Sequence, residues 1–503
     1  MIKIKNKKLK FTFVYPDFEY SITKNGANII KGGWYSEGIA QLASIIENLG
    51  WNVDLIHLTE PIQKESFIRL LKKSNPDIIG FSVRTGVWRK AKEMIKYASN
   101  LKKFVIVGSY HPTLWPDEVI QWKGVNAICI GEGEQPVIKL IKNYKNSNKL
   151  RKIESLWVKE KNGKIYKNKI HPLIEDLNTL PLPKFEIFDF SKLLSSKIKT
   201  ATVVLTRGCP YNCTYCWNNY ARSLYPNKHK YVRFRNPNNC INYINKVLKV
   251  YPEILTFRFQ DDLWPFHNDW FDKFSKLYIE GIKIRFECHL RADLLNDKII
   301  KTLKRMGCFG IYFGVESGND YIRNKILKRN MSKESLLNAF KTCKKYKIKT
   351  HAYNIVGIPH ENMRKVLDTI KLNAKLEPTD MFYFIFFPYA GTELSNIAIE
   401  SKFYDPRKPL DPIINIEMPD FKGNQIRFAN LYGRVFTRIY QIIYKLPRFI
   451  SKILEKIIDL IWLFPYYPFK ILNSLMIFYR KIEEKVKIII KKHFFGLYII
   501  LKR

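Results

Sequence analysis

The chain has 503 residues, a length that favours two or three domains over a single core. Hydrophobic residues make up 46% of it and aromatic residues 14%, which excludes a chain that is disordered throughout. The formal net charge of +41 would suit a nucleic acid or an anionic membrane. The surplus is spread along the chain instead of gathered in one arm, which argues against a nucleic-acid partner.

The eight cysteines predict a metal site in a reducing compartment, and hence a cytoplasmic location. Three of them crowd into residues 209–216 and the others stand singly in apolar surroundings, unlike a disulfide framework. The first ten residues lack the apolar run of a signal peptide. No stretch of about 18 uncharged apolar residues occurs, so we expect no conventional transmembrane helix.

Residues 9–145 predict a doubly wound, flavodoxin-like α/β domain. Short apolar runs alternate with amphipathic segments such as Glu37–Leu49 and Val87–Asn100, as expected for five parallel strands with helices on both faces. Ligands of such folds bind at the carboxyl ends of the strands. The predicted strands are Lys10–Tyr15, Trp51–His57, Asp77–Val83, Lys103–Val107 and Asn126–Ile130.

Residues 146–198 predict a connector. Asn162-Gly163 between two short apolar runs indicates a hairpin, and Leu180-Pro181-Leu182-Pro183 forbids regular structure. Residues 199–400 then predict six strand–helix units, which form a partial (β/α)6 TIM-like barrel with its chemistry at the carboxyl strand ends. The predicted strands are Ala201–Thr206, Ile254–Gln260, Lys283–His289, Gly310–Val315, Thr350–Val356 and Met381–Phe387.

Residues 401–503 predict a C-terminal extension with basic amphipathic helices. Apolar and basic residues interleave at helical spacing in Phe449–Leu463 and Phe478–Lys492, and the chain from Leu431 onward has 15 basic and 4 acidic residues. This composition is typical of a helix that lies in a membrane interface. We expect peripheral contact with the inner face of a membrane and, through it, a lipid-linked substrate. The alternative is a helical cap on the barrel.

Three cysteines follow the first predicted barrel strand as C-x3-C-x2-C, namely Cys209, Cys213 and Cys216. Thiolates are the usual ligands of iron–sulfur clusters, and four are normal for a cubane. Three local ligands therefore leave one iron open to a small chelating molecule. A structural zinc site would need a second pair of cysteines or histidines, and none is near in the sequence.

This loop, with Tyr215 before the last cysteine, resembles that of the radical S-adenosylmethionine (radical SAM) superfamily. The resemblance implies a 4Fe–4S cluster on the three cysteines, with S-adenosylmethionine chelated at the open iron. It further implies cleavage of that molecule to a 5′-deoxyadenosyl radical, with an electron from a donor such as a flavodoxin or a ferredoxin.

Motifs at the ends of the later barrel strands fit the same resemblance. They are Gln260-Asp261-Asp262, Arg291-Ala292-Asp293, Gly314–Gly318 and Asn354–Pro359. Each places polar groups or glycine at the catalytic rim, where a zwitterionic, hydroxyl-rich ligand needs hydrogen bonds. Ordinary loop capping is the alternative for each residue. The S-adenosylmethionine site implied in this way contains Tyr215, Asp261, Arg291, Glu316, Ser317 and Gly357.

The first domain resembles the cobalamin-binding domains that precede the barrel in one branch of this superfamily. The resemblance lies in Gly38–Leu49, Asn75–Ser82, Val107–Thr113 and Gly131-Glu132-Gly133-Glu134. The D-x-H-x-x-G motif of histidine-ligated cobalamin is absent, so we expect cobalamin without a histidine ligand. A scaffold that has lost its cofactor is the alternative. The implied cobalamin site contains Ser82, Gly108, His111, Gly131 and Gly133, and His111 could instead be a loop histidine bonded to backbone.

The predicted enzyme acts on a small-molecule or lipid-linked substrate in one of two ways. A substrate radical could take a methyl group from methylcobalamin, or the same parts could serve ring closure, rearrangement or oxidation. A non-enzymatic alternative is a cobalamin or iron–sulfur sensor. A methylthiotransferase-like tRNA enzyme is another, but it would carry three further clustered cysteines and a C-terminal domain of strands, which this sequence does not predict.

Overall fold

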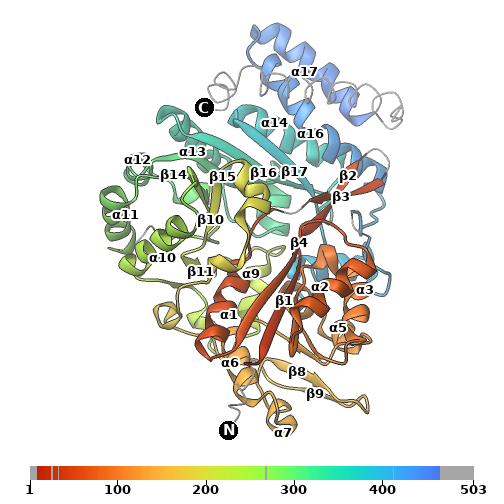
Figure 1. Ribbon diagram of the computed structural model, residues 1–503. Coiled ribbons are helices and arrows are strands. Elements are labelled where there is room, and N and C mark those ends of the chain that lie inside the picture. Colours follow the sequence, from red (N-terminus) through yellow and green to blue (C-terminus); the bar gives the residue numbers. More distant parts are fainter. Residues whose placement is uncertain are drawn as a thin grey trace, which may run out of the picture.

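The computed structural model describes residues 8–464 except 24, 25, 32, 265, 267, 268 and 412. Two α/β units lie against each other, and a pair of helices projects at the end farthest from the N-terminus (Figure 1).

The first unit is built on a sheet in the order β4-β1-β5-β6-β7-β8-β9, in which the first five strands are parallel. Strands β1, β5 and β6 are buried over most of their length, as expected for parallel strands covered on both faces. The sheet confirms the predicted doubly wound fold. The strands are β1 Lys10–Pro16, β4 Asn52–Leu58, β5 Ile78–Ser82, β6 Phe104–Gly108, β7 Ala127–Cys129, β8 Leu156–Lys159 and β9 Ile165–Lys167.

Helices cover both faces of this sheet. The buried apolar residues of α1 and α6 belong to the core on one face, and those of α2, α3 and α5 to the core on the other. The helices are α1 Glu37–Asn48, α2 Lys64–Ser74, α3 Trp88–Ser99, α4 Tyr110–Leu114, α5 Pro116–Gln121, α6 Glu134–Asn143 and α7 Ser147–Leu150.

Two hairpins enlarge the first unit beyond the predicted five strands. The Asn162-Gly163 turn joins β8 to β9, and β8 pairs antiparallel with β7, so the predicted connector extends the sheet. Strands β2 Phe18–Thr23 and β3 Gly26–Lys31 form a separate antiparallel hairpin between β1 and α1, which the sequence analysis missed.

The second unit is an open half-barrel. Its six strands are all parallel, in the order β10-β13-β14-β15-β16-β17, which confirms the predicted partial barrel. The strands are β10 Thr200–Val203, β13 Thr256–Phe259, β14 Arg285–Leu290, β15 Cys308–Glu316, β16 Lys349–Val356 and β17 Asp380–Ile385; β11 Thr206–Arg207 and β12 Arg233–Phe234 form a small side ribbon. Helix α8 Leu194–Lys197 precedes the first of these strands and α15 Glu393–Glu400 follows the last; the helices between them are α9 Trp217–Ser223, α10 Pro237–Val250, α11 Asp269–Gly281, α12 Asp297–Arg305, α13 Lys333–Lys345 and α14 Met363–Leu376.

The C-terminal extension begins as a cap on the half-barrel. Helix α16 Gly423–Ile443 packs against α14 and β17 and buries Phe428, Tyr432 and Tyr440. Helix α17 Arg448–Leu463 follows and rests on α14 and α16. The predicted helix Phe478–Lys492 lies outside the described residues. Among the residues described, no helix is both long and apolar enough to span a bilayer.

A single tryptophan anchors α17. Trp462 is fully buried, and its indole N–H donates to the Met363 carbonyl at 2.8 Å. We expect Trp462→Ala to lower the free energy of unfolding by about 3–5 kcal/mol, because it leaves a large cavity. Urea titration followed by circular dichroism measures the change. Leu460→Ala, two residues away and 70% exposed, is the control and should cost less than about 0.5 kcal/mol. Equal effects of the two variants would contradict this account.

Candidate functional site

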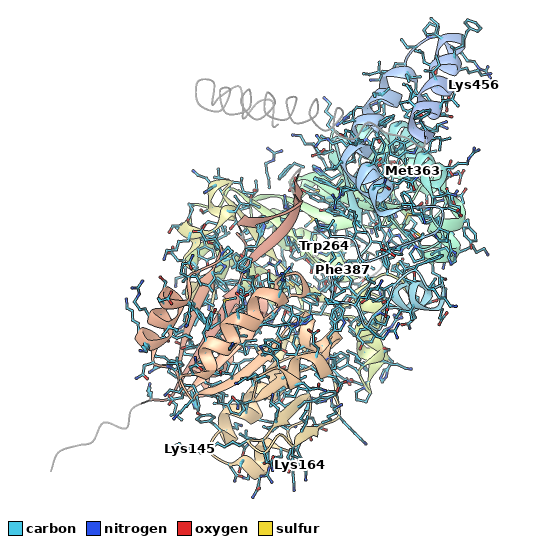
Figure 2. All side chains as sticks on the ribbon, turned by 90° about the vertical axis from the view of Figure 1, so that its right-hand side faces the viewer. Lys145, Lys164, Trp264, Met363, Phe387 and Lys456 are labelled. Carbon is cyan, nitrogen blue, oxygen red and sulfur yellow. The ribbon has the colours of Figure 1, made fainter. Side chains whose placement is uncertain are left out.

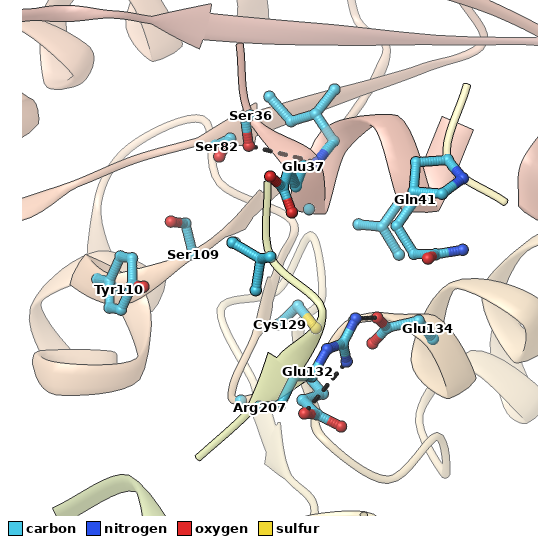
Figure 3. A pocket seen from close by; sticks show the side chains of 18 of the residues that line it. Ser36, Glu37, Gln41, Ser82, Ser109, Tyr110, Cys129, Glu132, Glu134 and Arg207 are labelled. Atoms are coloured by element: carbon cyan, nitrogen blue, oxygen red, sulfur yellow. Dashed lines mark hydrogen bonds and ion pairs between the residues drawn. The ribbon is translucent and has the colours of Figure 1, made fainter. Parts of the chain in front are cut away.

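The carboxyl strand ends of the two units face each other across one cavity of about 540 Å³ (Figure 3). The wall from the first unit includes Ser82, Gly108, Gly131 and Gly133, which lie at or after the ends of β5, β6 and β7. The opposite wall comes from residues 204–208, immediately before Cys209, and from helix α9, immediately after Cys216. The residues contributed by this second wall include Thr206, Arg207, Gly208, Trp217 and Asn218.

The wall from the first unit suits a flat, amide-rich group such as cobalamin. Gly131 has a φ of +78°, and a Cβ there would lie 2.5 Å from the Tyr225 hydroxyl oxygen, so only glycine fits. Glu37 lines the same cavity, and its Oε1 atom is buried without a hydrogen-bond partner among the described residues. Burial raises the pKa of the Glu37 carboxyl to about 8. A protonated carboxyl with one unpartnered oxygen in a cavity wall fits a polar ligand.

His111 does not line this cavity, contrary to the sequence prediction. Its ring is fully buried between Trp88, at 4.7 Å between ring centroids, and Trp115, at 5.0 Å. Burial, together with the nearby Lys92 ammonium, lowers the pKa of His111 to about 3, so the ring stays neutral. The short helix α4 turns the side chain into the core instead of toward the strand ends, where Gly108 and Gly131 lie.

Two aspartates shape the cysteine loop. The Asp261 Oδ1 atom accepts hydrogen bonds from the backbone N–H of Leu205 at 2.8 Å and from the backbone N–H and hydroxyl of Thr206 at 2.6 and 2.8 Å. Asp262 accepts from the Gly208 N–H at 3.1 Å and from the Asn218 amide at 2.8 Å. Asp261 was predicted to contact S-adenosylmethionine, and the structure instead turns one of its oxygens into the loop.

Cationic donors approach the sulfur of Cys213. The Arg329 Nη1 atom lies 3.8 Å from it and the Arg291 Nη1 atom 4.0 Å from it. The Asn218 amide donates to the Cys216 sulfur at 3.9 Å. Guanidinium donors stabilise thiolates, so this donor set fits an anionic, thiolate-bound cluster. In the part of the chain that the structure describes, no three His, Cys, Asp or Glu side chains lie close enough together to bind one metal ion.

Three of the residues predicted to bind S-adenosylmethionine come together beside Cys213. The Tyr215 hydroxyl donates to Glu316 Oε1 at 2.9 Å, and the Arg291 guanidinium lies 3.6 Å from the ring centroid of Tyr211. Glu316 has a φ of +63°, a strained backbone for this residue type and common at functional sites. Burial raises the pKa of its carboxyl.

The other two predicted residues are placed differently. Ser317 is fully buried, with its hydroxyl 3.4 Å from that of Thr369. The backbone N–H of Gly357 donates to Glu361 Oε2 at 2.7 Å, at the end of β16. Glu361 therefore supports the loop that carries Gly357, a role that the sequence analysis missed.

Arg329 is the second residue that the sequence analysis missed. Its guanidinium is buried and donates to the Gly314 carbonyl at 2.6 Å and to the Tyr215 hydroxyl at 3.3 Å. The backbone is left-handed at both of its neighbours, Lys328 and Asn330, and a π-helical turn precedes them. No spacing in the sequence signals this fold-back, because the position of Arg329 depends on that irregular turn.

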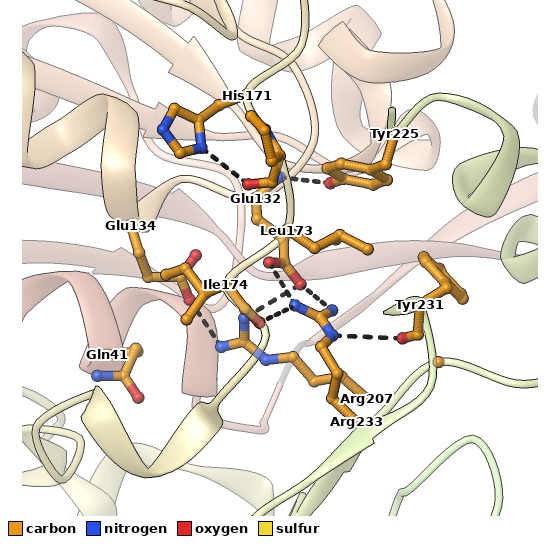
Figure 4. A network of polar contacts seen from close by, with 12 residues as sticks. Gln41, Glu132, Glu134, His171, Leu173, Ile174, Arg207, Tyr225, Tyr231 and Arg233 are labelled. Carbon is orange, nitrogen blue, oxygen red and sulfur yellow. Dashed lines mark hydrogen bonds and ion pairs between the residues drawn. The ribbon is translucent and has the colours of Figure 1, made fainter. Parts of the chain in front are cut away.

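An ionic network joins the cysteine loop to the first unit (Figure 4). The Arg207 guanidinium lies 2.7 Å from Glu134 and 3.2 Å from Glu132, and Arg233 binds both oxygens of Glu132 at 2.6 and 3.0 Å. Burial alone would raise the pKa of Glu132, but the two arginines outweigh it and lower the pKa. Because Glu132 and Glu134 flank Gly133, the network ties the cavity wall of one unit to the loop of the other.

Breaking this ionic network should lower the free energy of unfolding. We expect Arg233→Gln to lower the free energy of unfolding by about 3–5 kcal/mol, because Arg233 is 4% exposed and its loss leaves Glu132 short of a buried partner. Chemical denaturation measures the loss. The control is Lys298→Gln, which breaks a pair whose side chains are 75% and 57% exposed and should cost less than about 1 kcal/mol. A loss of stability no larger than that of the control would contradict the claim that the buried Arg233–Glu132 pair stabilises the fold.

Glu361 predicts a pH dependence of stability. Burial raises the pKa of its carboxyl to about 8, although the N–H groups of Gly357 and Ile358 favour the charged form. The folded state then holds a proton that the unfolded state loses above its ordinary pKa of 4.5, so stability falls as the pH rises from 4.5 to about 8. We expect Glu361→Gln to gain stability relative to the wild type across that window, measured by urea midpoints. The control is Glu400→Gln, an exposed change. A gain that is constant with pH would contradict the prediction.

Comparisons with known proteins agree with this geometry. The family model of the radical SAM superfamily matches residues 203–372, and that of the B12 binding domain matches residues 27–141. An uncharacterized methyltransferase of Pyrococcus horikoshii is 26% identical over 444 residues, which cover 86% of this chain and 93% of that protein.

Solved structures share the fold. The cobalamin-dependent S-adenosylmethionine radical enzyme OxsB, with aqua-cobalamin and S-adenosylmethionine bound, superposes with a TM-score of 0.68 at 16% identity, covering 94% of this chain and 76% of that one. The radical S-adenosylmethionine methyltransferase TsrM from Kitasatospora setae, with cobalamin and a 4Fe–4S cluster bound, gives a TM-score of 0.62 at 14% identity and covers 79% of each chain. The two matched domains and the facing strand ends lead to one conclusion: the chain joins a B12 binding domain, residues 27–141, to a radical SAM domain, residues 203–372.

Proposed function

We propose that this enzyme transfers a methyl group to a carbon atom of a small-molecule substrate, using S-adenosylmethionine, a 4Fe–4S cluster and cobalamin. One observation carries the proposal: the residues that flank the cysteine loop, Thr206–Gly208 on one side and Trp217 and Asn218 on the other, face the glycine-lined strand ends of the B12 binding domain across the same cavity. When bound, the cluster supplies the electron that cleaves S-adenosylmethionine to a 5′-deoxyadenosyl radical, and cobalamin supplies the methyl group.

The chain's own residues have distinct tasks in this proposal. Cys209, Cys213 and Cys216 hold the cluster, and Arg291 and Arg329 offset its negative charge at Cys213. Ser82, Gly108, Gly131 and Gly133 leave room for the corrin, while His111 takes no part because its ring is enclosed.

The S-adenosylmethionine site is proposed beside Cys213. Tyr215, Glu316 and Arg291 form the polar wall that meets the methionine or ribose part of the ligand. Gly357 contributes backbone at the rim, and Asp261 and Ser317 act indirectly, through the loops that they brace. Burial of this wall excludes water from the radical.

A radical SAM enzyme of this kind needs an electron donor and a small-molecule substrate. We propose a flavodoxin or a ferredoxin as the donor. The net charge of +41 favours an acidic donor, since opposite charges speed the encounter of two proteins. The eight cysteines are all free thiols in the structure, which supports the proposal that the enzyme works in the reducing cytoplasm.

The experiment uses the full chain, reconstituted without oxygen and supplied with cobalamin, a chemical reductant and S-adenosylmethionine that carries a deuterated methyl group. We expect 5′-deoxyadenosine and cobalamin with the labelled methyl, both measured by mass spectrometry. The triple variant of Cys209, Cys213 and Cys216 to alanine should lose the iron and the 5′-deoxyadenosine. Cys240→Ala, which removes a buried thiol outside the loop, should keep both.

The two readouts separate the alternatives. Formation of 5′-deoxyadenosine by the triple variant would overturn the assignment of the cluster ligands. 5′-Deoxyadenosine from the wild type with no label on cobalamin would replace methyl transfer by rearrangement or oxidation. Bound cobalamin with no 5′-deoxyadenosine would point to a sensor.

A further inference from the structure

Helix α17 turns its apolar side chains outward, toward solvent. Phe449 is 76% exposed, Leu460 70% and Phe464 56%. These side chains recur at intervals of three and four residues and therefore share one face of the helix. The exposed apolar residues of this outer face are Phe449, Ile450, Ile453, Ile457, Leu460 and Phe464.

The acidic residues of α17 point the other way. Lys371 of α14 lies 2.9 Å from Glu455 and 2.7 Å from Asp459, and the Tyr440 hydroxyl donates to Asp459 at 2.7 Å. The buried Trp462 lies on this inner side as well. Both acids of the helix thus contact the body of the protein, and neither lies on the outer face.

Exposed basic residues lie beside the outer face: Lys456 borders it, and Lys452 and Arg448 follow on the flank that leads to Glu455. Arg448, Lys452 and Lys456 are exposed, and Lys456 lies at the far tip of the projecting helices (Figure 2). The turn before α17 adds exposed Lys445 and Leu446. The chain that continues beyond residue 464 contains nine Lys or Arg residues and two Glu residues. The outer face therefore combines apolar side chains with adjacent positive charge.

We propose that the outer face of α17 binds the surface of an anionic lipid bilayer. Apolar side chains of such a helix enter the boundary between headgroups and acyl chains, and the lysines and arginines lie among the phosphates. A second copy of the chain fits this face poorly, because a symmetric contact would bring the exposed Lys452 and Lys456 of one copy close to those of the other. The proposal stands independently of the reaction that the enzyme catalyses.

The test is sedimentation of the full-length protein with phosphatidylcholine vesicles, with and without phosphatidylglycerol. We expect the wild type to bind the vesicles that contain phosphatidylglycerol and to bind less at high salt. The double variant Phe449→Glu, Leu460→Glu should lower the partition coefficient about tenfold or more, because it places charge in the apolar stripe. Lys452→Glu combined with Lys456→Glu should weaken binding to the anionic vesicles only.

Leu255→Glu is the matched control, since Leu255 is 61% exposed on the barrel before β13. It should bind vesicles as the wild type does, and all variants should keep the wild-type circular dichroism spectrum. Three results would overturn the proposal. One is the absence of binding to vesicles that contain phosphatidylglycerol, and another is binding that the α17 variants leave unchanged. The third is a dimer in solution that the Phe449→Glu, Leu460→Glu variant dissociates.

Discussion

Asp261 and Asp262 fix the cysteine loop at the end of the first barrel strand by accepting hydrogen bonds from its backbone, and the rest of the site depends on these hydrogen bonds. The backbone N–H groups of the residues just before Cys209 need acceptors, because unpaired buried N–H groups are costly. The two carboxylates accept hydrogen bonds from three of these groups, at Leu205, Thr206 and Gly208. Burial raises the pKa of Asp261 to about 6, so the carboxylate is still ionised at neutral pH.

The same hydrogen bonds orient the loop toward the B12 binding domain. Because Thr206 is fixed, the next residue, Arg207, extends into the neighbouring unit and meets Glu132 and Glu134. Buried ion pairs of this kind add little net stability, but they penalise every arrangement in which a charge is left unpaired. Here they define how the cavity wall of one unit faces the loop of the other, and apolar packing of Phe11, Phe13 and Val203 in a shared core supports that arrangement.

The two helices of the C-terminal extension illustrate how similar patterns lead to different roles. Both α16 and α17 interleave apolar with basic residues. Helix α16 buries its apolar face against α14 and β17 as part of the barrel core, whereas α17 directs its acidic residues inward to Lys371 and its apolar stripe outward. Periodicity predicts that a helix has two faces, but only the neighbouring elements decide which face is covered.

The sequence by itself determined those features of the protein that depend on residues close together in the chain. The strand–helix alternation predicted both sheets, and Cys209, Cys213 and Cys216 stand close enough along the chain to be recognised as one ligand set. Tertiary structure decided the rest. It enclosed His111 between two tryptophans, turned Asp261 into the loop, and brought Arg329 and Glu361 to the barrel rim. These placements depend on irregular turns and on contacts between residues far apart in the chain, which no local pattern of residue types encodes.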